Sequence, residues 1–309
     1  MTENSDKGVT ILADGLCFPE GPVWMNDGTV IVTEVGAGKL TRICPDGRKE
    51  TVALCNGGPN GAAIGPDGML YVCNNGGMIC YEADGILWTK GEPLPDYDGG
   101  WIDRIDPTTG KVDRLYDKVE GRRLAGPNDI VFDAAGGFWF TDFGKHSGHF
   151  TENGGIYYAL PDGSSITRII DGPRFNGIGL SPDGRTLYAA LSFESLLVGF
   201  DVTAPGVLDL SGGPAGRAVG QFKPQQHPDS LAVDALGNIC AGLCMVDPGV
   251  GSVDPRTGKI VDHDFNDKLT TNICFGGDDM QDAWVTLSTT GCLAKLRWNT
   301  PGLKLAYYA

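Results

Sequence analysis

The sequence has no apolar run long enough to span a bilayer, and its first seven residues contain no hydrophobic leader core. It is also short of positive charge, with 24 Lys and Arg against 39 Asp and Glu, a net charge of −15. Nucleic acids and anionic membrane surfaces are bound through clustered Lys and Arg, so neither is expected as a partner. A nucleotide fingerprint, a phosphate-cradling loop and a usefully placed Gly-x-Ser-x-Gly elbow are absent as well.

Cysteine is present in an odd number, nine residues, and several of these lie inside apolar strand-like patterns, as Cys73, Cys240 and Cys274 do. Such residues are typical of reduced, buried thiols and argue against a disulfide framework. Together with the missing leader, they predict a cytoplasmic location.

What the chain has is a repeat. Residues 176–191 begin with Asn176 and Gly177, continue as an apolar run, turn at Asp183-Gly184 and return as a second apolar run. This is the pattern of a β-hairpin, because Asp-Gly adopts the positive φ angles of a tight turn. Five further segments share the layout, with the sixth carrying Met280 at the turn glycine; the six copies start at Glu20, Asn60, Asn128, Asn176, Asp229 and Asn272.

Each hairpin is followed by two more strand-like runs joined by turns such as Pro45-Asp-Gly and Pro161-Asp-Gly. No long stretch has helical periodicity. Four short strands repeated six times predict an all-β fold, a six-bladed β-propeller with four-stranded blades around a central channel, and residues 1–309 are expected to form this single domain. The run Val9 to Leu16 is placed to complete the last blade and close the ring.

The first residues of the six copies are all polar. In a propeller the innermost strands run in the same direction along the channel, so equivalent positions form a ring at one mouth. Here the ring contains the two carboxylates of Glu20 and Asp229 and the carboxamides of Asn60, Asn128, Asn176 and Asn272. Two buried carboxylates need a compensating cation or a shared proton. Oxygen donors suit Ca²⁺, Mg²⁺ or Mn²⁺, with Zn²⁺ and Fe²⁺ left open, and a purely structural role as strand caps is the alternative for Asn60 and Asn272.

The chain resembles the gluconolactonase, regucalcin (senescence marker protein) and luciferin-regenerating enzyme family over nearly its whole length. The segments that carry the resemblance are Pro19–Trp24, Gly126–Asp129, Phe175–Gly184 and Pro228–Asp234. The resemblance implies one divalent metal held by Glu20, Asn176 and Asp229, an approach of Asn128 to the metal or substrate, and hydrolysis of an ester within a ring, usually a sugar lactone.

The chain departs from the family pattern at two positions. Sugar-lactone members tend to carry Arg two residues before the Asn that matches Asn128, where this chain has Gly126, and Ser230 stands where Gly is common. Arginine is a strong clamp for hydroxyl and carboxylate groups, so the missing Arg weakens the expectation of an aldonolactone substrate. Arg122 or Arg123 are the upstream residues that could replace it.

The leading hypothesis is therefore a metal-dependent lactonase in which the cation polarises the lactone carbonyl and water attacks it. Asp229 is the expected catalytic residue, either as the general base itself or as the relay for a water on the metal, and Asn128 and Asn60 are expected to orient the lactone. Two alternatives are a phosphotriesterase on the same metal site and a non-catalytic ligand-binding propeller.

Other features of the sequence have candidate roles. Lys145, His146 and His149 are expected in a loop near the channel mouth, more readily than as a zinc pair. His227 is placed to shape the loop before Asp229 or to hydrogen-bond the site. Cys17 is expected as a packed core thiol more readily than as a nucleophile. Cys240 and Cys244 are four residues apart but lack the second pair of a structural zinc site, so such a site is not expected. The loop 88–101 belongs to the second blade, and its aromatic residues Trp88, Tyr97 and Trp101 either line a substrate pocket or pin the loop.

Overall fold

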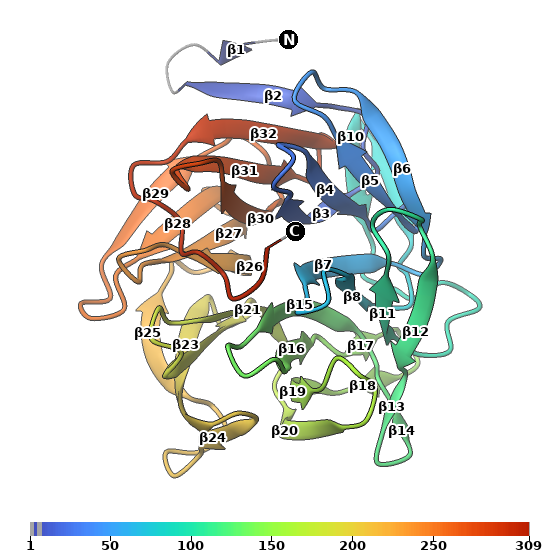
Figure 1. Ribbon diagram of the computed structural model, residues 1–309, viewed down its shortest axis with the longest axis vertical. Helices are drawn as coiled ribbons and strands as arrows, with labels where there is room; N and C mark the ends of the chain where they lie inside the picture. The colour runs from blue at the N-terminus through green and yellow to red at the C-terminus, as the bar shows by residue number, and fades with distance from the viewer. Residues whose placement is uncertain (1–2, 5–7, 309) are drawn as a thin grey trace.

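The computed structural model describes residues 3–4 and 8–308. The N-terminal stretch Met1–Lys7, in which no leader was expected, lies outside them apart from residues 3–4. The described residues form strands and connecting turns without an α-helix. Among them no helix has the length and apolar character needed to cross a membrane. The strands are arranged as six sheets around a channel, a six-bladed β-propeller, which confirms the fold predicted from the repeat (Figure 1).

Each blade is an antiparallel sheet whose first strand lies at the channel. These innermost strands are β3 (Pro19–Trp24), β7 (Pro59–Ile64), β15 (Pro127–Phe132), β21 (Phe175–Leu180), β26 (Gln226–Val233) and β30 (Thr270–Gly276). The second strands are β4 (Val30–Glu34), β8 (Leu70–Asn74), β16 (Phe138–Asp142), β22 (Thr186–Leu191), β27 (Ile239–Met245) and β31 (Asp282–Leu287).

The outer half of each blade completes the sheet. The third strands are β5 (Lys39–Ile43), β11 (Trp101–Ile105), β19 (Gly154–Ala159), β23 (Leu196–Ala204), β28 (Gly249–Val253) and β32 (Cys292–Arg297). The outermost strands are β6 (Lys49–Leu54), β12 (Val112–Tyr116), β20 (Ile166–Gly172), β25 (Arg217–Gln221), β29 (Ile260–Asp264) and β2 (Val9–Ala13).

The ring is closed by the N-terminal strand. β2 pairs antiparallel with β32, so the sixth blade combines the beginning of the chain with its end, as the run Val9 to Leu16 predicted. β1 (Glu3–Asn4) adds to its outer edge. This closure ties the beginning of the chain to its end by main-chain hydrogen bonds within the sixth blade.

The predicted hairpin turns are also confirmed. The five turn glycines of the repeat, from Gly28 to Gly237, have φ angles between 68° and 96°. Met280 takes the same role in the sixth blade with φ 58°, a left-handed conformation that is unusual for a side chain of this kind. The hairpin turn of the sixth blade therefore has a positive φ angle like the other five, although it lacks glycine.

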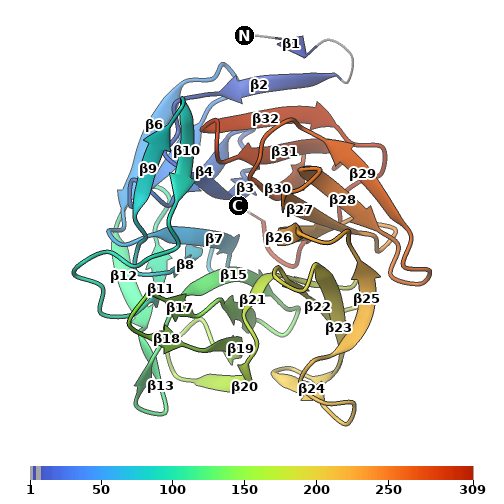
Figure 2. The same cartoon turned by 180° about the vertical axis from the view of Figure 1, so that it is seen from behind.

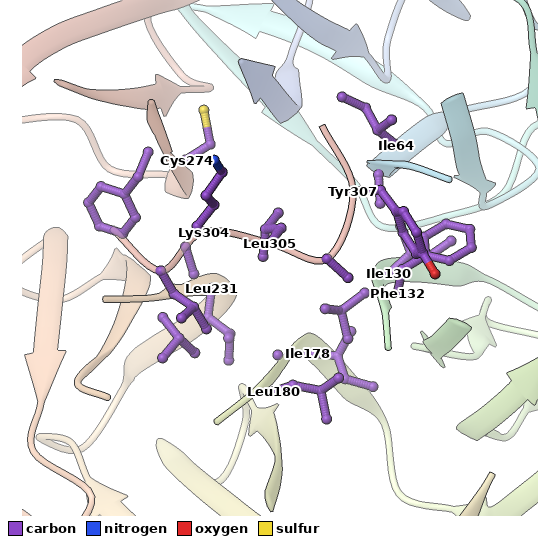
Figure 3. Close-up of a pocket in the computed structure, with 18 of the residues that line it drawn as sticks. Ile64, Ile130, Phe132, Ile178, Leu180, Leu231, Cys274, Lys304, Leu305 and Tyr307 are labelled. Atoms are coloured by element: carbon purple, nitrogen blue, oxygen red, sulfur yellow. The ribbon is translucent and has the colours of Figure 1, made fainter. Parts of the chain in front are cut away.

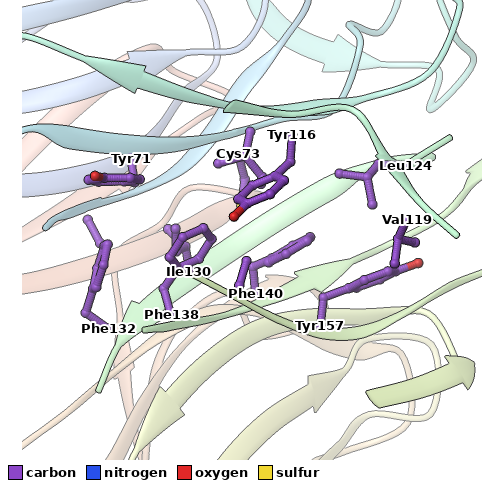
Figure 4. Close-up of a cluster of buried hydrophobic side chains, with 13 residues drawn as sticks. Tyr71, Cys73, Tyr116, Val119, Leu124, Ile130, Phe132, Phe138, Phe140 and Tyr157 are labelled. Atoms are coloured by element: carbon purple, nitrogen blue, oxygen red, sulfur yellow. The ribbon is translucent and has the colours of Figure 1, made fainter. Parts of the chain in front are cut away.

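Apolar side chains fill the spaces between neighbouring blades. The cluster between the second and third blades contains Tyr71, Phe132 and Phe138 packed edge to face or tilted, with ring centroids 5.0 to 5.6 Å apart (Figure 4). Aromatic pairs of this geometry add stability beyond the area that they bury. Each blade thus depends on the next for its core, as expected for a propeller.

Extra strands lie mainly at the face where the innermost strands begin. β9 (Cys80–Ala83) and β10 (Ile86–Thr89) form a hairpin that Figure 2 shows in front of the first blade. Its Leu87 amide donates to Thr289 O of the sixth blade at 2.9 Å. The remaining short strands are β13 (Lys118–Val119), β14 (Arg122–Arg123), β17 (Lys145–His146), β18 (Thr151–Glu152) and β24 (Val207–Asp209).

All nine cysteines are free thiols, and five of them are buried. Cys17, Cys80, Cys274 and Cys292 are half-buried. Burial raises the pKa of the Cys240 thiol to about 12, so this core cysteine is protonated at neutral pH.

Candidate functional site

The ring of polar residues lies where every innermost strand is interrupted by a β-bulge. The register against the second strand shifts after Glu20 in the first blade, after Pro59, Pro127, Phe175 and Pro228 in the next four, and between Thr270 and Asn272 in the sixth. A bulge bends the strand and re-aims side chains, and bulges are common next to functional sites. The predicted residues of the first five blades therefore share one structural position around the channel, and Asn272 lies one residue further along its strand.

Glu20 is buried, with 2% of its surface exposed, and its Oε2 accepts hydrogen bonds from Gly21 N at 2.8 Å and Asn272 Nδ2 at 2.9 Å. Loss of hydration raises the pKa of the Glu20 carboxyl, while these donors act in the opposite direction. Asn272 is displaced by one residue relative to the other blades, and its own Oδ1 accepts from Ile273 N. Asn272 thus acts as a hydrogen-bond partner of Glu20.

Asp229 is the second carboxylate of the ring and is half-buried. Cys244 Sγ donates to its Oδ2 at 3.4 Å, and the Asn176 side chain also hydrogen-bonds to it. Burial raises the pKa of Asp229 well above its usual range, and the nearby Glu20 carboxylate raises it further. Two carboxylates predicted from residues 209 positions apart are therefore electrostatic neighbours.

A third carboxylate, Asp129, joins them and was not expected from the sequence. Its Oδ2 accepts from Ile178 N at 3.1 Å and its Oδ1 from Ile130 N at 3.0 Å. Burial, and next the Glu20 charge, raises the pKa of Asp129 to about 7. Strict strand alternation would send Asp129 to the face opposite Asn128; the bulge removes that alternation and keeps both buried near the channel.

Asp129 could have been predicted as a site residue from the sequence, because other blades have glycine at the matching position. A Cβ on Gly61 would lie 2.6 Å from Asp129 Oδ1, and one on Gly177 would lie 2.5 Å from Asp229 O. At Gly61 and Gly177 atoms of the neighbouring blade occupy the space that a side chain would need. Three blades have glycine after the ring residue, and Asp129 is the one carboxylate among the three residues that replace it, the others being Ser230 and Ile273.

Three carboxamide oxygens of the ring have no hydrogen-bond partner although they are buried. They are Oδ1 of Asn60, Asn128 and Asn176, whose side chains are 6 to 7% exposed. A buried acceptor without a donor costs roughly 1–3 kcal/mol. Orphaned oxygens beside three carboxylates match the donor set of a hard divalent cation. Among the described residues no group of three or more His, Cys, Asp or Glu side chains is arranged to hold a metal ion, so carboxamides would have to contribute.

The backbone of the ring is held by side chains of the preceding blade. Thr33 Oγ1 donates to Asn60 O at 2.7 Å, Ser192 Oγ to Pro228 O at 2.6 Å and Ser288 Oγ to Pro19 O at 2.6 Å. Thr141 Oγ1 donates to Asn176 O in the same way. The backbone at four of the six ring positions is thus held by a hydroxyl of the neighbouring blade.

Gly126 has no room for the arginine that the family pattern would place there. Its amide donates to Asp142 Oδ1 at 2.7 Å, and an added Cβ would lie 2.5 Å from Gly144 O. Arg122 and Arg123 do not replace it, because they are exposed and pair with Asp171 and Glu152 respectively. The proposed upstream substitute is therefore wrong.

A different arginine lies two residues before a ring asparagine, Arg174 before Asn176. Its Nε donates to Phe143 O at 3.0 Å, and its guanidinium lies over the Phe143 and Phe193 rings at 4.5 and 5.0 Å. Phe193 is 56% exposed and contacts the His227 ring edge to face. Arg174 precedes an innermost strand, Phe143 and Phe193 follow second strands, and His227 lies at the start of β26, so together they flank the mouth with an aromatic wall.

Lys145, at the mouth end of the third blade, is buried, and its Nζ donates to Asn75 O of the second blade at 2.7 Å. Loss of hydration lowers its pKa to about 8. His146 and His149 are exposed on the β17–β18 turn, where His146 Nδ1 lies 2.8 Å from Thr151 Oγ1. The two imidazoles do not form a metal pair with other described side chains.

The aromatic residues of the loop 88–101 are used for anchoring. Trp101 Nε1 donates to Asp103 Oδ2 at 2.7 Å, and Tyr97 Oη donates to Ala125 O at 2.7 Å. Tyr97 also stacks on Phe150 with ring centroids 6.2 Å apart. The contacts of Tyr97 and Trp101 therefore support a role in pinning the loop rather than in lining a substrate pocket.

A six-bladed propeller with polar residues at the start of its innermost strands is a broad structural class. Comparison with known proteins identifies the family within this class. Residues 18–289 match the family model described as the SMP-30/Gluconolactonase/LRE-like region, and the chain belongs to this family. Lactonase drp35 of Staphylococcus saprophyticus is 30% identical over 245 residues, which cover 78% of this chain and 65% of that protein. The matched region thus spans slightly less than two thirds of that relative.

Solved structures share the fold. A gluconolactonase from Xanthomonas campestris superposes with a TM-score of 0.73 at 22% identity, covering 95% of this chain and 89% of the other. A regucalcin from Agrobacterium tumefaciens, described as a calcium-binding protein, superposes with a TM-score of 0.67 at 19% identity, covering 96% and 97%. At these identities the likeness concerns the six-bladed propeller.

Proposed function

We propose that this protein is a lactonase that uses one divalent cation at the polar ring. The observation that carries the proposal is the set of three buried carboxamide oxygens without donors beside the carboxylates of Glu20 and Asp229. Lactone hydrolysis is supported by family membership and by the lactonase and gluconolactonase relatives.

Glu20, Asn176 and Asp229 would hold the cation, and Asn60 and Asn128 would contact the lactone. When bound, the cation would withdraw electron density from the lactone carbonyl and neutralise the converging carboxylates. The regucalcin neighbour is described as calcium-binding, and the all-oxygen donors favour Ca²⁺ for this chain as well.

Asp229 would act as the general base. It is the more exposed of the two ring carboxylates, whereas Glu20 is buried and its Oε2 accepts from Gly21 N and Asn272 Nδ2. In the reaction a water oxygen bonds to the carbonyl carbon and its proton passes to the Asp229 carboxylate. The carbon–oxygen bond of the ring then breaks, and the ring oxygen takes up a proton to leave as the alcohol of a hydroxy acid. Asn128 would orient the lactone by hydrogen bonding through its amide.

The mouth favours a lactone with an apolar substituent over a polyhydroxylated one. Gly126 leaves no side chain where an arginine clamp would lie, and Phe193 and Phe143 present aromatic surface instead. Arg174, held between those rings, would contact the acid group of the product. We therefore propose alkyl- or aryl-substituted γ- and δ-lactones as the substrate class.

The decisive experiment strips divalent cations with a chelator and then assays a panel of sugar and non-sugar lactones with each cation restored. Hydrolysis should vanish with the cation and return with it, and alkyl lactones should exceed aldonolactones in kcat/KM. Glu20→Gln and Asp229→Asn should each lower kcat/KM by roughly 10²-fold or more, as expected for a group that acts on the reacting atoms. Activity that survives complete cation removal would disprove the mechanism. A panel left intact with every cation would favour a phosphotriesterase or a binding propeller.

A further inference from the structure

The channel contains a cavity of about 350 Å³ below the polar ring (Figure 3). It is lined by the distal halves of the innermost strands, with Ile130, Ile178 and Leu231 among the residues that Figure 3 draws around it. These residues follow the ring positions along each strand. The cavity therefore lies on the side of the ring that is remote from the mouth and its aromatic wall, and we call it the lower chamber.

The C-terminal segment 303–308 lies across the lower chamber. Figure 1 shows the chain end at the centre of the propeller, and Leu303, Leu305 and Tyr307 belong to the lining. The segment is fixed where it enters, because Leu303 N donates to Val233 O at 2.9 Å and Gly302 N to Met280 O at 2.7 Å. Its end is held by ring contacts, Tyr307 on Phe132 at 5.7 Å and Tyr308 on Trp24 at 5.9 Å.

The walls of the chamber are mainly aliphatic and aromatic. Polar side chains line it at its ring end, where Asp129 and Asn272 contribute, and at the strand turns, where Asp133 and Asp183 do. Lys304 is the sole basic residue among the lining residues. The balance of charge is therefore negative, which disfavours an anionic guest.

An apolar cavity of this size is a binding site in its own right. An engineered cavity of about 150 Å³ with similar walls stays free of water and binds benzene, and this chamber is more than twice as large. Ligand pockets begin at about 300 Å³. Leaving such a space unfilled costs packing contacts that an apolar guest would restore.

We propose that the lower chamber binds a small, uncharged, apolar molecule of about two fused rings or the equivalent alkyl chain. The site is separate from the proposed lactone site, with Asp129 and Asn272 forming the boundary between them. Because the acidic side chains surround the chamber, a guest with the same body and an anionic group binds more weakly.

A matched pair of fluorescent probes tests both parts of the proposal. N-phenyl-1-naphthylamine is neutral, and 1-anilinonaphthalene-8-sulfonate has the same aromatic body with a sulfonate. Titration of the full-length protein should show saturable binding of the neutral probe with one site per chain and an affinity at least tenfold above that of the sulfonate. No saturable binding of the neutral probe, or equal binding of both, would overturn the proposal.

Cavity-filling variants test whether the neutral probe binds in the lower chamber. Ala62 and Ala232 line the chamber and are half-buried, whereas Ala204 is exposed at the end of β23. Ala62→Phe and Ala232→Phe should weaken binding of the neutral probe at least tenfold, and the control Ala204→Phe should leave it unchanged. Unchanged affinity in folded Ala62→Phe and Ala232→Phe variants would contradict the chamber as the site.

A measurement on the unmodified protein covers the case in which these variants fail to fold. Crystals soaked in bromobenzene should show an anomalous bromine peak between Asp129 and Leu305. A peak only at the mouth, or no peak, would count against the proposal. Loss of the lactone reaction would leave this result untouched, so the two hypotheses fail separately.

Discussion

Asn272 donates a hydrogen bond to Glu20 at 2.9 Å, although the two residues are 252 positions apart and belong to the last and first blades. The contact exists because β2 closes the ring and brings the sixth blade against the first. It fixes the orientation of a carboxylate that we propose as a cation ligand.

Asn272→Ala should weaken cation binding by roughly 10–100-fold, the usual effect of removing a group that orients a metal ligand. Glu20 would lose one of its donors and gain rotational freedom, while Asn60, Asn176 and Asp229 stay in place. Isothermal titration with Ca²⁺ and the other divalent ions measures the change. Asn238→Ala, on the turn of the fifth blade, is the control, and an Asn272→Ala affinity equal to wild type would show that Glu20 is oriented by other contacts.

Asp129→Asn should stabilise the cation-free protein at neutral and alkaline pH. The folded pKa of Asp129 is about 7, above the value of about 3.9 for an unfolded Asp, so stability falls as pH rises between these values. A difference of about three pKa units corresponds to about 4 kcal/mol, and the variant lacks this loss. Chemical unfolding in a chelator from pH 4 to pH 8 measures the two slopes.

Identical slopes for wild type and Asp129→Asn would mean that Asp129 is ionised in the folded protein throughout. Repeating the series with a saturating cation adds a control. The cation should reduce the slope in the wild type, because it favours the ionised carboxylates that the empty ring destabilises.

Thr141→Val and Thr33→Val remove the same kind of bond from two different blades. Thr141 donates to Asn176 O and Thr33 to Asn60 O. Each change should cost about 1–3 kcal/mol in stability, since a buried carbonyl loses its donor. Only Thr141→Val should also weaken cation binding, because Asn176 is the proposed ligand and Asn60 a substrate contact. Equal effects of both variants on the cation would refute this division of roles.

Lys145→Met should become less advantageous as pH rises. The folded pKa of Lys145 is about 8, below the unfolded value of about 10.4, so the wild type gains stability between pH 8 and pH 10.4, by up to about 3 kcal/mol. The methionine variant keeps the apolar stem but does not titrate. The difference in unfolding free energy between the two proteins, followed over this range, measures the gain; Lys223→Met, at an exposed site, should show no such trend.

The order of strands and the ring could be predicted because both follow from local chemistry that repeats. Asp-Gly turns set the hairpins, apolar alternation set the strands, and Glu20, Asn176 and Asp229 were recognised because they start equivalent copies. Their burial, and the proximity of Glu20 to Asp229, agree with that expectation. The metal assignment and the cytoplasmic location remain predictions.

Only the tertiary structure determines which side chains reach the site through a bulge and which positions are crowded by a neighbouring segment. Asp129 lies near the ring because a bulge breaks strand alternation, and Gly126 excludes a side chain because Gly144 O occupies the space. The lower chamber arises because the last residues fold back over the channel. A one-dimensional pattern carries periodicity and turn chemistry, whereas close approach between distant segments depends on the closed ring.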